Sequence, residues 1–142
     1  MGLSRDSYPY FSFKGRSVLM AYQLLMEKHA DVLHVKSVGI RTIETVLAMS
    51  GDIMHACAQQ GTVKVLVDVR ALEGRLPTID AYQVPNSLFS EIRDREIIQK
   101  CAIVDLKEFE NSYRFFENVA VNRGYNLRIF SDVNDAIKWL QK

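Results

Sequence analysis

This chain of 142 residues has few of the residues that identify a chemistry, and each scarcity excludes a class of protein. It contains only two cysteines, Cys57 and Cys101. Cys57 falls within a helical pattern and Cys101 begins an apolar run, so we interpret both as small buried residues rather than as a disulfide framework. Unpaired cysteines of this kind are typical of a reducing compartment. We therefore expect a cytoplasmic protein.

The chain also lacks an excess of charge of one sign and a long apolar run. The 18 basic residues nearly cancel the 17 acidic residues, which leaves a formal net charge of +1. We therefore expect no nucleic-acid partner. The chain has no apolar run of about 18 residues, the length of a membrane-spanning helix, and its N-terminus lacks the order of a signal peptide. A soluble, unexported domain is expected.

Catalytic motifs are absent from the sequence as well. No glycine-rich phosphate loop, nucleophile elbow or paired-cysteine metal motif occurs. Asp68 and Asp105 each end a predicted strand and could in principle bind magnesium or accept a phosphoryl group. Such a site would also need a third acid and a placed lysine, for which Lys107 is only a loose candidate. We interpret both aspartates as acceptors for loop amides and expect no enzyme, cofactor or metal.

The stretch 63–77 organises the rest of the chain. Its first seven residues are a nearly unbroken run of β-branched and apolar side chains. A strand buries both faces in this way when helices cover both sides of the sheet, or when helices cover one side and a domain partner covers the other, so we predict a central parallel strand. The charged loop 70–77 follows at its carboxyl end, where open α/β sheets hold their ligands. A binding site is predicted there.

Two strands joined by a turn at Asp31 are predicted over 22–30 and 32–42, because β-branched and apolar residues are frequent on both sides of it. His29 and His34 flank this turn. Two imidazoles bind a metal only with further ligands, which the sequence does not identify. We interpret both histidines as solvent-facing residues of a hairpin.

A helix is predicted from Thr42, which suits the cap position, to Gly61, which stops it. Its apolar residues recur at three- and four-residue spacing. Gly51 leaves a break in this helix as an alternative. The pattern places Asp52 and His55 on the polar, exposed face.

The second half of the chain alternates helices and strands. Thr78 can cap a helix, and Pro85 is expected to kink that helix or divide it into two short ones. The elements predicted after the charge run 93–96 are a strand over 100–106, a helix over 108–122, a strand over 125–130 and a last helix capped by Ser131.

Residues 1–19 do not match the pattern of the rest. Aromatic residues crowd together around Pro9, and no strong structure is predicted. Two interpretations stay open: a native arm that lies against the domain or a neighbouring subunit, or a segment that precedes a natural start at Met20. The expected organisation is an N-terminal extension over 1–19 and one domain over 20–142.

Three segments within this order resemble a known family. They are Val-Leu-Val-Asp-Val-Arg-Ala-Leu-Glu-Gly at 65–74, Cys-Ala-Ile-Val-Asp at 101–105, and Phe-Ser-Asp-Val-Asn-Asp-Ala-Ile-Lys-Trp-Leu at 130–140. Over 20–142 the chain resembles the SpoIIAA-like family of STAS-domain proteins. The resemblance implies an α/β fold: a mixed, mostly parallel sheet with an N-terminal hairpin and about four packed helices. It also implies regulation by partner binding, without catalysis, and self-association as a homodimer.

The chain departs from the anti-sigma-factor antagonists of this group at one point. Those proteins carry Asp-Ser-Ser-Gly at the start of the helix after the central strand, where a serine is phosphorylated. Here the segment 76–80 reads Leu-Pro-Thr-Ile-Asp, with no acid before Thr78 and no glycine after it. We interpret Thr78 as a helix cap, with a phosphoacceptor role as the alternative.

A second implication of the resemblance is a bound ligand, because SpoIIAA-like proteins are similar to lipid-carrying CRAL-TRIO domains and are thought to bind nonpolar ligands or membrane surfaces. Arg70 and Arg75 are candidates for binding an anionic head group. The candidate cleft residues are Tyr82, Leu88, Phe89, Phe109, Tyr113 and Phe116. Their alternative role is packing in the core. The expected function is binding of a small nonpolar or lipid-like ligand, with a regulatory protein partner as the alternative.

Overall fold

The computed structural model describes residues 7–13, 21–91 and 98–142. For residues 7–13 and for several residues of the helix over 78–91, Thr78, Tyr82 and Phe89 among them, it describes the backbone only. The predicted charge run 93–96 lies outside the described residues. The elements are β1 (Ser7–Phe13), β2 (Ala21–His29), β3 (Val32–Ile40), α1 (Ile43–Gln60), β4 (Lys64–Asp68), β5 (Leu72–Glu73), α2 (Thr78–Glu91), β6 (Lys100–Val104), the short 3-10 helix η2 (Lys107–Phe109), α3 (Glu110–Asn122), β7 (Leu127–Phe130) and α4 (Val133–Leu140).

The strands form one sheet in the order β1-β2-β3-β4-β6-β7, with the short β5 paired to the end of β3. The first three strands are antiparallel, whereas β3, β4, β6 and β7 are parallel to one another. Strand β4 lies between β3 and β6, with Val65 level with Leu33 and Cys101. The prediction of a central parallel strand is therefore confirmed.

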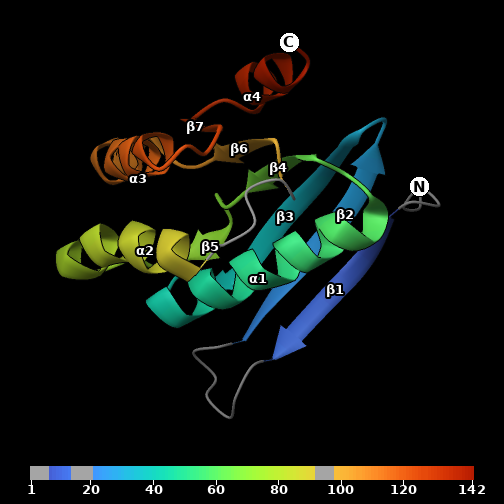
Figure 1. The fold of residues 1–142 in the computed structure, drawn as a ribbon. Helices are drawn as coiled ribbons and strands as arrows, with labels where there is room; N and C mark the ends of the chain where they lie inside the picture. The colour runs from blue at the N-terminus through green and yellow to red at the C-terminus, as the bar shows by residue number, and fades with distance from the viewer. Residues whose placement is uncertain (1–6, 14–20, 92–97) are drawn as a thin grey trace.

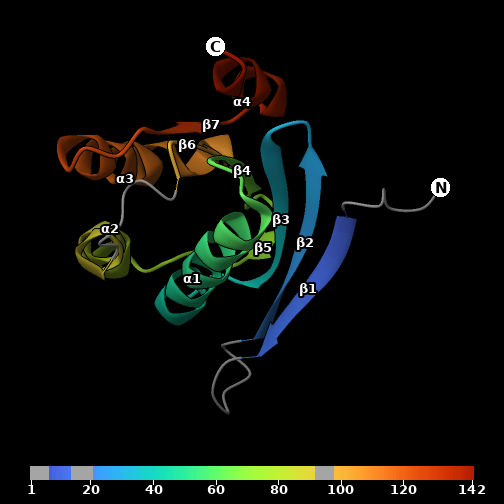
Figure 2. The same ribbon diagram turned by 45° about the vertical axis from the view of Figure 1, so that its right-hand side comes forward.

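Helices cover both faces of this sheet, which is one of the two arrangements that the apolar run of β4 predicts. Helices α1, α2 and α3 lie on one side and α4 on the other (Figures 1 and 2). Val65 and Val67 of β4 pack in the cluster beneath α1, while Leu66 packs in the cluster beneath α4. The mixed, mostly parallel α/β architecture and its four α-helices agree with the sequence prediction.

The predicted hairpin forms, with its turn at Ala30 and Asp31. Its face toward α1 is buried through Leu24, Met26 and Val35. On the opposite face His29 is exposed and His34 is half-buried, with their ring centroids 4.7 Å apart. Within the part of the chain that the structure describes, no group of three or more candidate side chains could hold a metal ion.

Helix α1 begins and ends where the sequence predicts. The side chain of Thr42 accepts a hydrogen bond from the backbone N–H of Thr45 at 3.1 Å, and Gly61 ends the helix in the left-handed conformation, φ 67°. The helix continues without a break through Gly51. The placement of Asp52 on the exposed face is wrong: this carboxylate is buried and accepts a hydrogen bond from the Tyr22 hydroxyl.

Helix α2 is one continuous element that contains Pro85, so of the two predicted outcomes, a kink or two short helices, the second is wrong. An interior proline costs about 3 kcal/mol in an isolated helix. Here Pro85 is fully buried beside Val84, and the burial offsets part of that cost. Helix α2 packs mainly on α3 and α1 rather than on the strands.

The structure differs from the sequence prediction at two further places, residues 7–13 and the cap of α4. Residues 7–13, for which no strong structure is predicted, form strand β1 and pair with β2. The cap of α4 is Asp132 and not Ser131: the Asp132 carboxylate accepts hydrogen bonds from the backbone N–H groups of Asn134 and Asp135 at 2.7 and 3.2 Å. A carboxylate also suits the positive end of the helix dipole. None of the described helices is long and apolar enough to cross a membrane.

Candidate functional site

A cavity of about 230 Å³ lies between α1, α2, α3 and the sheet. It is lined mainly by apolar side chains, including Met49, Val67, Leu88, Ile103 and Ile129. The cavity exists because α2 rests on its neighbouring helices and does not pack closely on the strands. Its volume exceeds that of an engineered cavity of about 150 Å³ that binds benzene, and lies below the roughly 300 Å³ at which typical ligand pockets begin.

Five of the six predicted ligand-binding residues whose side chains the structure describes line this cavity. They are Arg75, Leu88, Phe109, Tyr113 and Phe116. Tyr113 also belongs to the buried cluster with Leu127 and Ile129, so lining the cavity and packing in the core are compatible roles. The side chains of Thr78, Tyr82 and Phe89 lie outside those that the structure describes.

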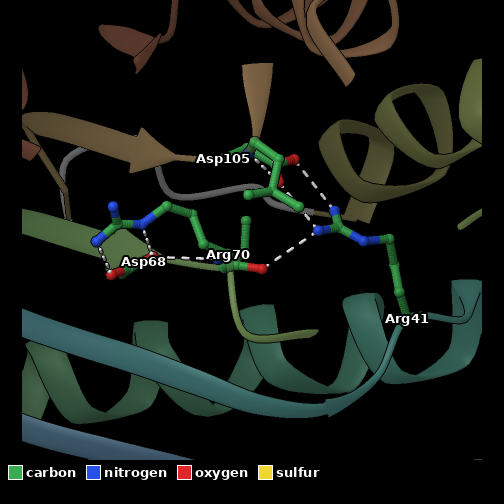
Figure 3. Close-up of polar contacts among 6 residues, drawn as sticks. Arg41, Asp68, Arg70 and Asp105 are labelled. Atoms are coloured by element: carbon green, nitrogen blue, oxygen red, sulfur yellow. Dashed lines mark hydrogen bonds and ion pairs between the residues drawn. The ribbon is translucent and has the colours of Figure 1, made fainter. Parts of the chain in front are cut away.

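Arg70 is not among the described residues that line the cavity. Its guanidinium binds Asp68 instead (Figure 3). Its Nε and Nη2 donate to the Asp68 carboxylate at 2.9 and 2.8 Å, and its backbone N–H donates to the same carboxylate at 3.1 Å. Burial alone would raise the pKa of Asp68, but these hydrogen bonds and the positive charge of Arg70 hold it below its ordinary value. The Arg70 side chain is 41% exposed.

Arg41, which sequence analysis missed, lies at the cavity instead. It follows β3, and Asp105 follows β6, so both leave the sheet at the edge where the parallel strands end. The Arg41 guanidinium donates from Nη1 and Nη2 to the two Asp105 oxygens at 3.1 and 3.0 Å, and from Nη2 to the carbonyl of Val69 at 3.2 Å (Figure 3). The two side chains are only 11% and 8% exposed. This nearly buried pair joins the ends of three neighbouring strands.

Both strand-end aspartates bond loop amides, as the sequence suggests. Asp105 accepts from the backbone N–H of Leu106 at 2.8 Å, and Asp68 accepts from that of Arg70. One signal could have found Arg41: it is the first polar residue after a strand whose carboxyl end meets that of β4.

The ring of Phe109 lies close to two guanidinium groups. Arg41 is 4.8 Å and Arg75 is 5.1 Å from the ring centroid. Phe109 ends η2, immediately before α3, and all three side chains line the cavity. Cation–π contacts of this kind hold the ring at the polar end of an otherwise apolar cavity.

Two further titratable groups line the cavity, and both stay protonated at neutral pH. Surrounding side chains remove the thiol of Cys101 from water, and Cys57 adds a repulsive charge, which together raise the pKa of Cys101 to about 12. Burial, followed by the charge and hydrogen bond of Glu110, raises the pKa of the Tyr113 hydroxyl. Neither group is a ready nucleophile or base, because the reactive form is the deprotonated one.

No protein-family model matches the chain, and no curated protein sequence matches it. The solved structures that are similar in fold include the following two. A protein described as an anti-sigma factor antagonist from Mycobacterium paratuberculosis superposes with a TM-score of 0.57 at 14% identity, over 89% of this chain and 100% of that one. An uncharacterised protein of the DUF3478 family with a SpoIIAA-like fold, from Shewanella loihica PV-4, superposes with a TM-score of 0.50 at 20% identity, over 98% and 99% of the two chains. The chain therefore has the SpoIIAA-like fold that its sequence predicts.

Proposed function

We propose that this protein is a noncatalytic binding protein that holds a small nonpolar ligand in the cavity beneath α2. The cavity itself carries the proposal: about 230 Å³ of space lined mainly by apolar side chains at the carboxyl edge of a mostly parallel sheet. This is where α/β sheets bind ligands. An apolar ligand in this space would remove the apolar side chains that line it from water, which favours binding.

The titratable groups at the cavity support binding over catalysis. The Arg41 guanidinium and the Asp105 carboxylate neutralise each other. The raised pKa values of Cys101 and Tyr113 keep their nucleophilic forms scarce at neutral pH. We therefore propose that the chain performs no covalent chemistry on what it binds.

Native mass spectrometry of freshly purified protein, followed by solvent extraction of the same sample, tests this proposal. A copurified nonpolar compound, or a mass increase when one is added, is expected. Ala81→Leu places a larger side chain in the cavity from α2 and should abolish the mass increase. Ala58→Leu, which adds the same group to an exposed position on α1, should retain it. A wild-type protein that binds no nonpolar compound would refute the proposal.

A second candidate function is that of a regulatory module that binds another protein. The fold similarity to a protein described as an anti-sigma factor antagonist favours it. In this case binding should be unaffected by Ala81→Leu, because the cavity is not the contact surface. A phosphorylation-dependent mass shift at Thr78, the first residue of α2, would support a switching mechanism in particular.

A further inference from the structure

The cavity extends along the strands from the amino edge of the sheet to the carboxyl edge. Three alternate side chains along β4 and three along β6, counting the residue just after each strand, line it: Val65, Val67, Val69, Cys101, Ile103 and Asp105. The first and the last member of each set are four residues apart, which is about 13 Å in a strand and roughly the length of an extended chain of ten carbon atoms. The space can therefore hold a short straight chain.

Most polar groups at the carboxyl end of this space are already bonded or covered. The Arg41 guanidinium and the Asp105 carboxylate bind each other, and the guanidinium also binds the carbonyl of Val69. The Nε of Arg41 and the hydroxyl of Ser37 are buried beneath neighbouring atoms. A ligand that reaches this end therefore meets apolar atoms first, and Phe109 supplies a ring of them.

The Phe109 ring is held in place by its neighbours in sequence and in space. Its backbone N–H donates to the carbonyl of Leu106 at 3.0 Å, so the short helix η2 fixes the residue soon after β6. The guanidinium groups of Arg41 and Arg75 lie 4.8 and 5.1 Å from the ring centroid. Cation–π attraction from both groups opposes a movement of the ring. Phe109 is therefore a fixed boundary of the cavity.

The ring also marks the border between the apolar space and solvent. Phe109 is half-buried, whereas Arg75 and Ser112, which line the cavity at the same end, are exposed. The guanidinium of Arg75 is thus solvated, and charges in such a position contribute little to binding. A chain that passed the ring would leave its apolar surroundings.

From these observations we infer that Phe109 is a specificity-determining residue, which ends the ligand space at the carboxyl edge and thereby sets the length of the ligand. A chain that stops at the ring is buried along its whole length. A longer chain has to displace the ring from its two guanidinium contacts or leave its last carbons in water. The inference rests on the proposed function and adds a selection by length to it.

Phe116 offers a matched control for Phe109. It also lines the cavity, and it lies seven residues further along, about 10 Å in the direction of α3. Residues seven apart share one side of a helix. Phe116 therefore borders the side of the space, whereas Phe109 borders its end.

Calorimetric titration of the intact chain with straight-chain alcohols, from 1-hexanol to 1-dodecanol, tests the inference. In the wild type the affinity should rise about fourfold with each added CH2 group up to roughly ten carbons and then stop rising. Phe109→Ala should extend this rise, so that 1-dodecanol binds at least about tenfold more tightly to the variant than to the wild type. Phe109→Trp should end the rise at a shorter chain. Phe116→Ala, which removes a ring of the same size from the side of the cavity, should leave the limit at the wild-type length.

The outcomes separate this inference from the proposed function. If none of the alcohols binds to the wild type, both fail. If they bind but the wild-type affinity rises through 1-dodecanol, or the limit is the same in both Phe109 variants, the cavity binds nonpolar ligands and Phe109 does not set their length. A shift of the limit in Phe116→Ala as large as in Phe109→Ala, or an equal loss of affinity for every alcohol in Phe109→Ala, would also overturn the inference. Thermal unfolding without alcohol verifies that each variant is folded, and Phe109→Trp provides the test if Phe109→Ala does not fold.

Discussion

The two faces of the sheet are packed differently, although β4 and β6 contribute to both. On the face toward α4, Ala102, Val104, Ala136 and Leu140 are at most 1% exposed and fill the space between helix and strands. On the opposite face, α2 rests on α1 and α3 and leaves the cavity. The first face is organised for stability. The second is packed less closely and contains buried polar groups, a pattern typical of a binding site.

Truncation on the two faces should give the largest contrast. Leu140→Ala removes a fully buried side chain from the α4 face and should lower the free energy of unfolding by about 3 to 5 kcal/mol. Leu88→Ala should cost roughly half as much, because one side of Leu88 already borders the cavity and makes fewer contacts. Urea unfolding of both variants measures the difference. Equal losses would mean that the cavity face is packed as tightly as the α4 face.

The ion pair at the polar end of the cavity should come next. Asp105→Asn leaves the nearly buried Arg41 charge uncompensated and should cost about 3 kcal/mol in urea unfolding. Asp68→Asn is the matched control, because the Arg70 side chain that it pairs with is 41% exposed, so weakening this pair should cost about 0 to 1 kcal/mol. A loss for Asp105→Asn as small as that of the control would contradict the assignment of a structural role to the Arg41 pair.

Enlarging an alanine on each face should give a smaller contrast. Ala136→Leu inserts a larger side chain where no space exists and should destabilise the protein by about 1 to 3 kcal/mol. Ala81→Leu places the same group in the cavity and should leave the unfolding temperature unchanged or raise it. Thermal unfolding of the two variants, side by side, makes the comparison. A lower unfolding temperature for Ala81→Leu than for Ala136→Leu would contradict it.

The smallest effect is expected at His34, on the face of the hairpin that points away from α1. Burial, and then the nearby His29, lowers the pKa of His34, against the opposing effect of Glu27. The unfolded chain therefore binds a proton more readily than the folded one. Stability should fall as the pH drops through the ordinary histidine pKa near 6.5. His34→Gln should remove this part of the pH dependence when unfolding temperatures are compared between pH 7.5 and 5.5. An unchanged profile would contradict it.

Local signals explain why most of the fold could be predicted. The period-two pattern of the hairpin, the unbroken apolar run of β4 and the cap and stop of α1 each depend on neighbours in sequence. The errors arise where tertiary contacts override such signals. Asp52 is placed on a polar face by helical spacing, yet it is buried because Tyr22, thirty residues away, donates to it. Strand β1 contains Pro9, which argues against a central strand but is compatible with the sheet edge that β1 occupies.

The candidate site could be predicted only in part. The edge of the sheet, the cleft between α2 and α3, and Arg75, Leu88, Phe109, Tyr113 and Phe116 follow from the chain order and agree with the cavity. The sequence did not distinguish Arg70, which is not among the described lining residues, from Arg41, which lines the cavity. The position of each guanidinium depends on which carboxylate the long side chain reaches.

The central claim is that nonpolar ligands enter the space beneath α2 and nowhere else in the core. Methyl carbon–proton NMR spectra, recorded during titration with octanoate, test it most directly. The methyl signals of Leu88, Ile103 and Ile129, which line the cavity, should shift, while those of Val104 and Leu140 beneath α4 should stay in place. Signals that do not move on either face, or that move equally on both, would contradict the account.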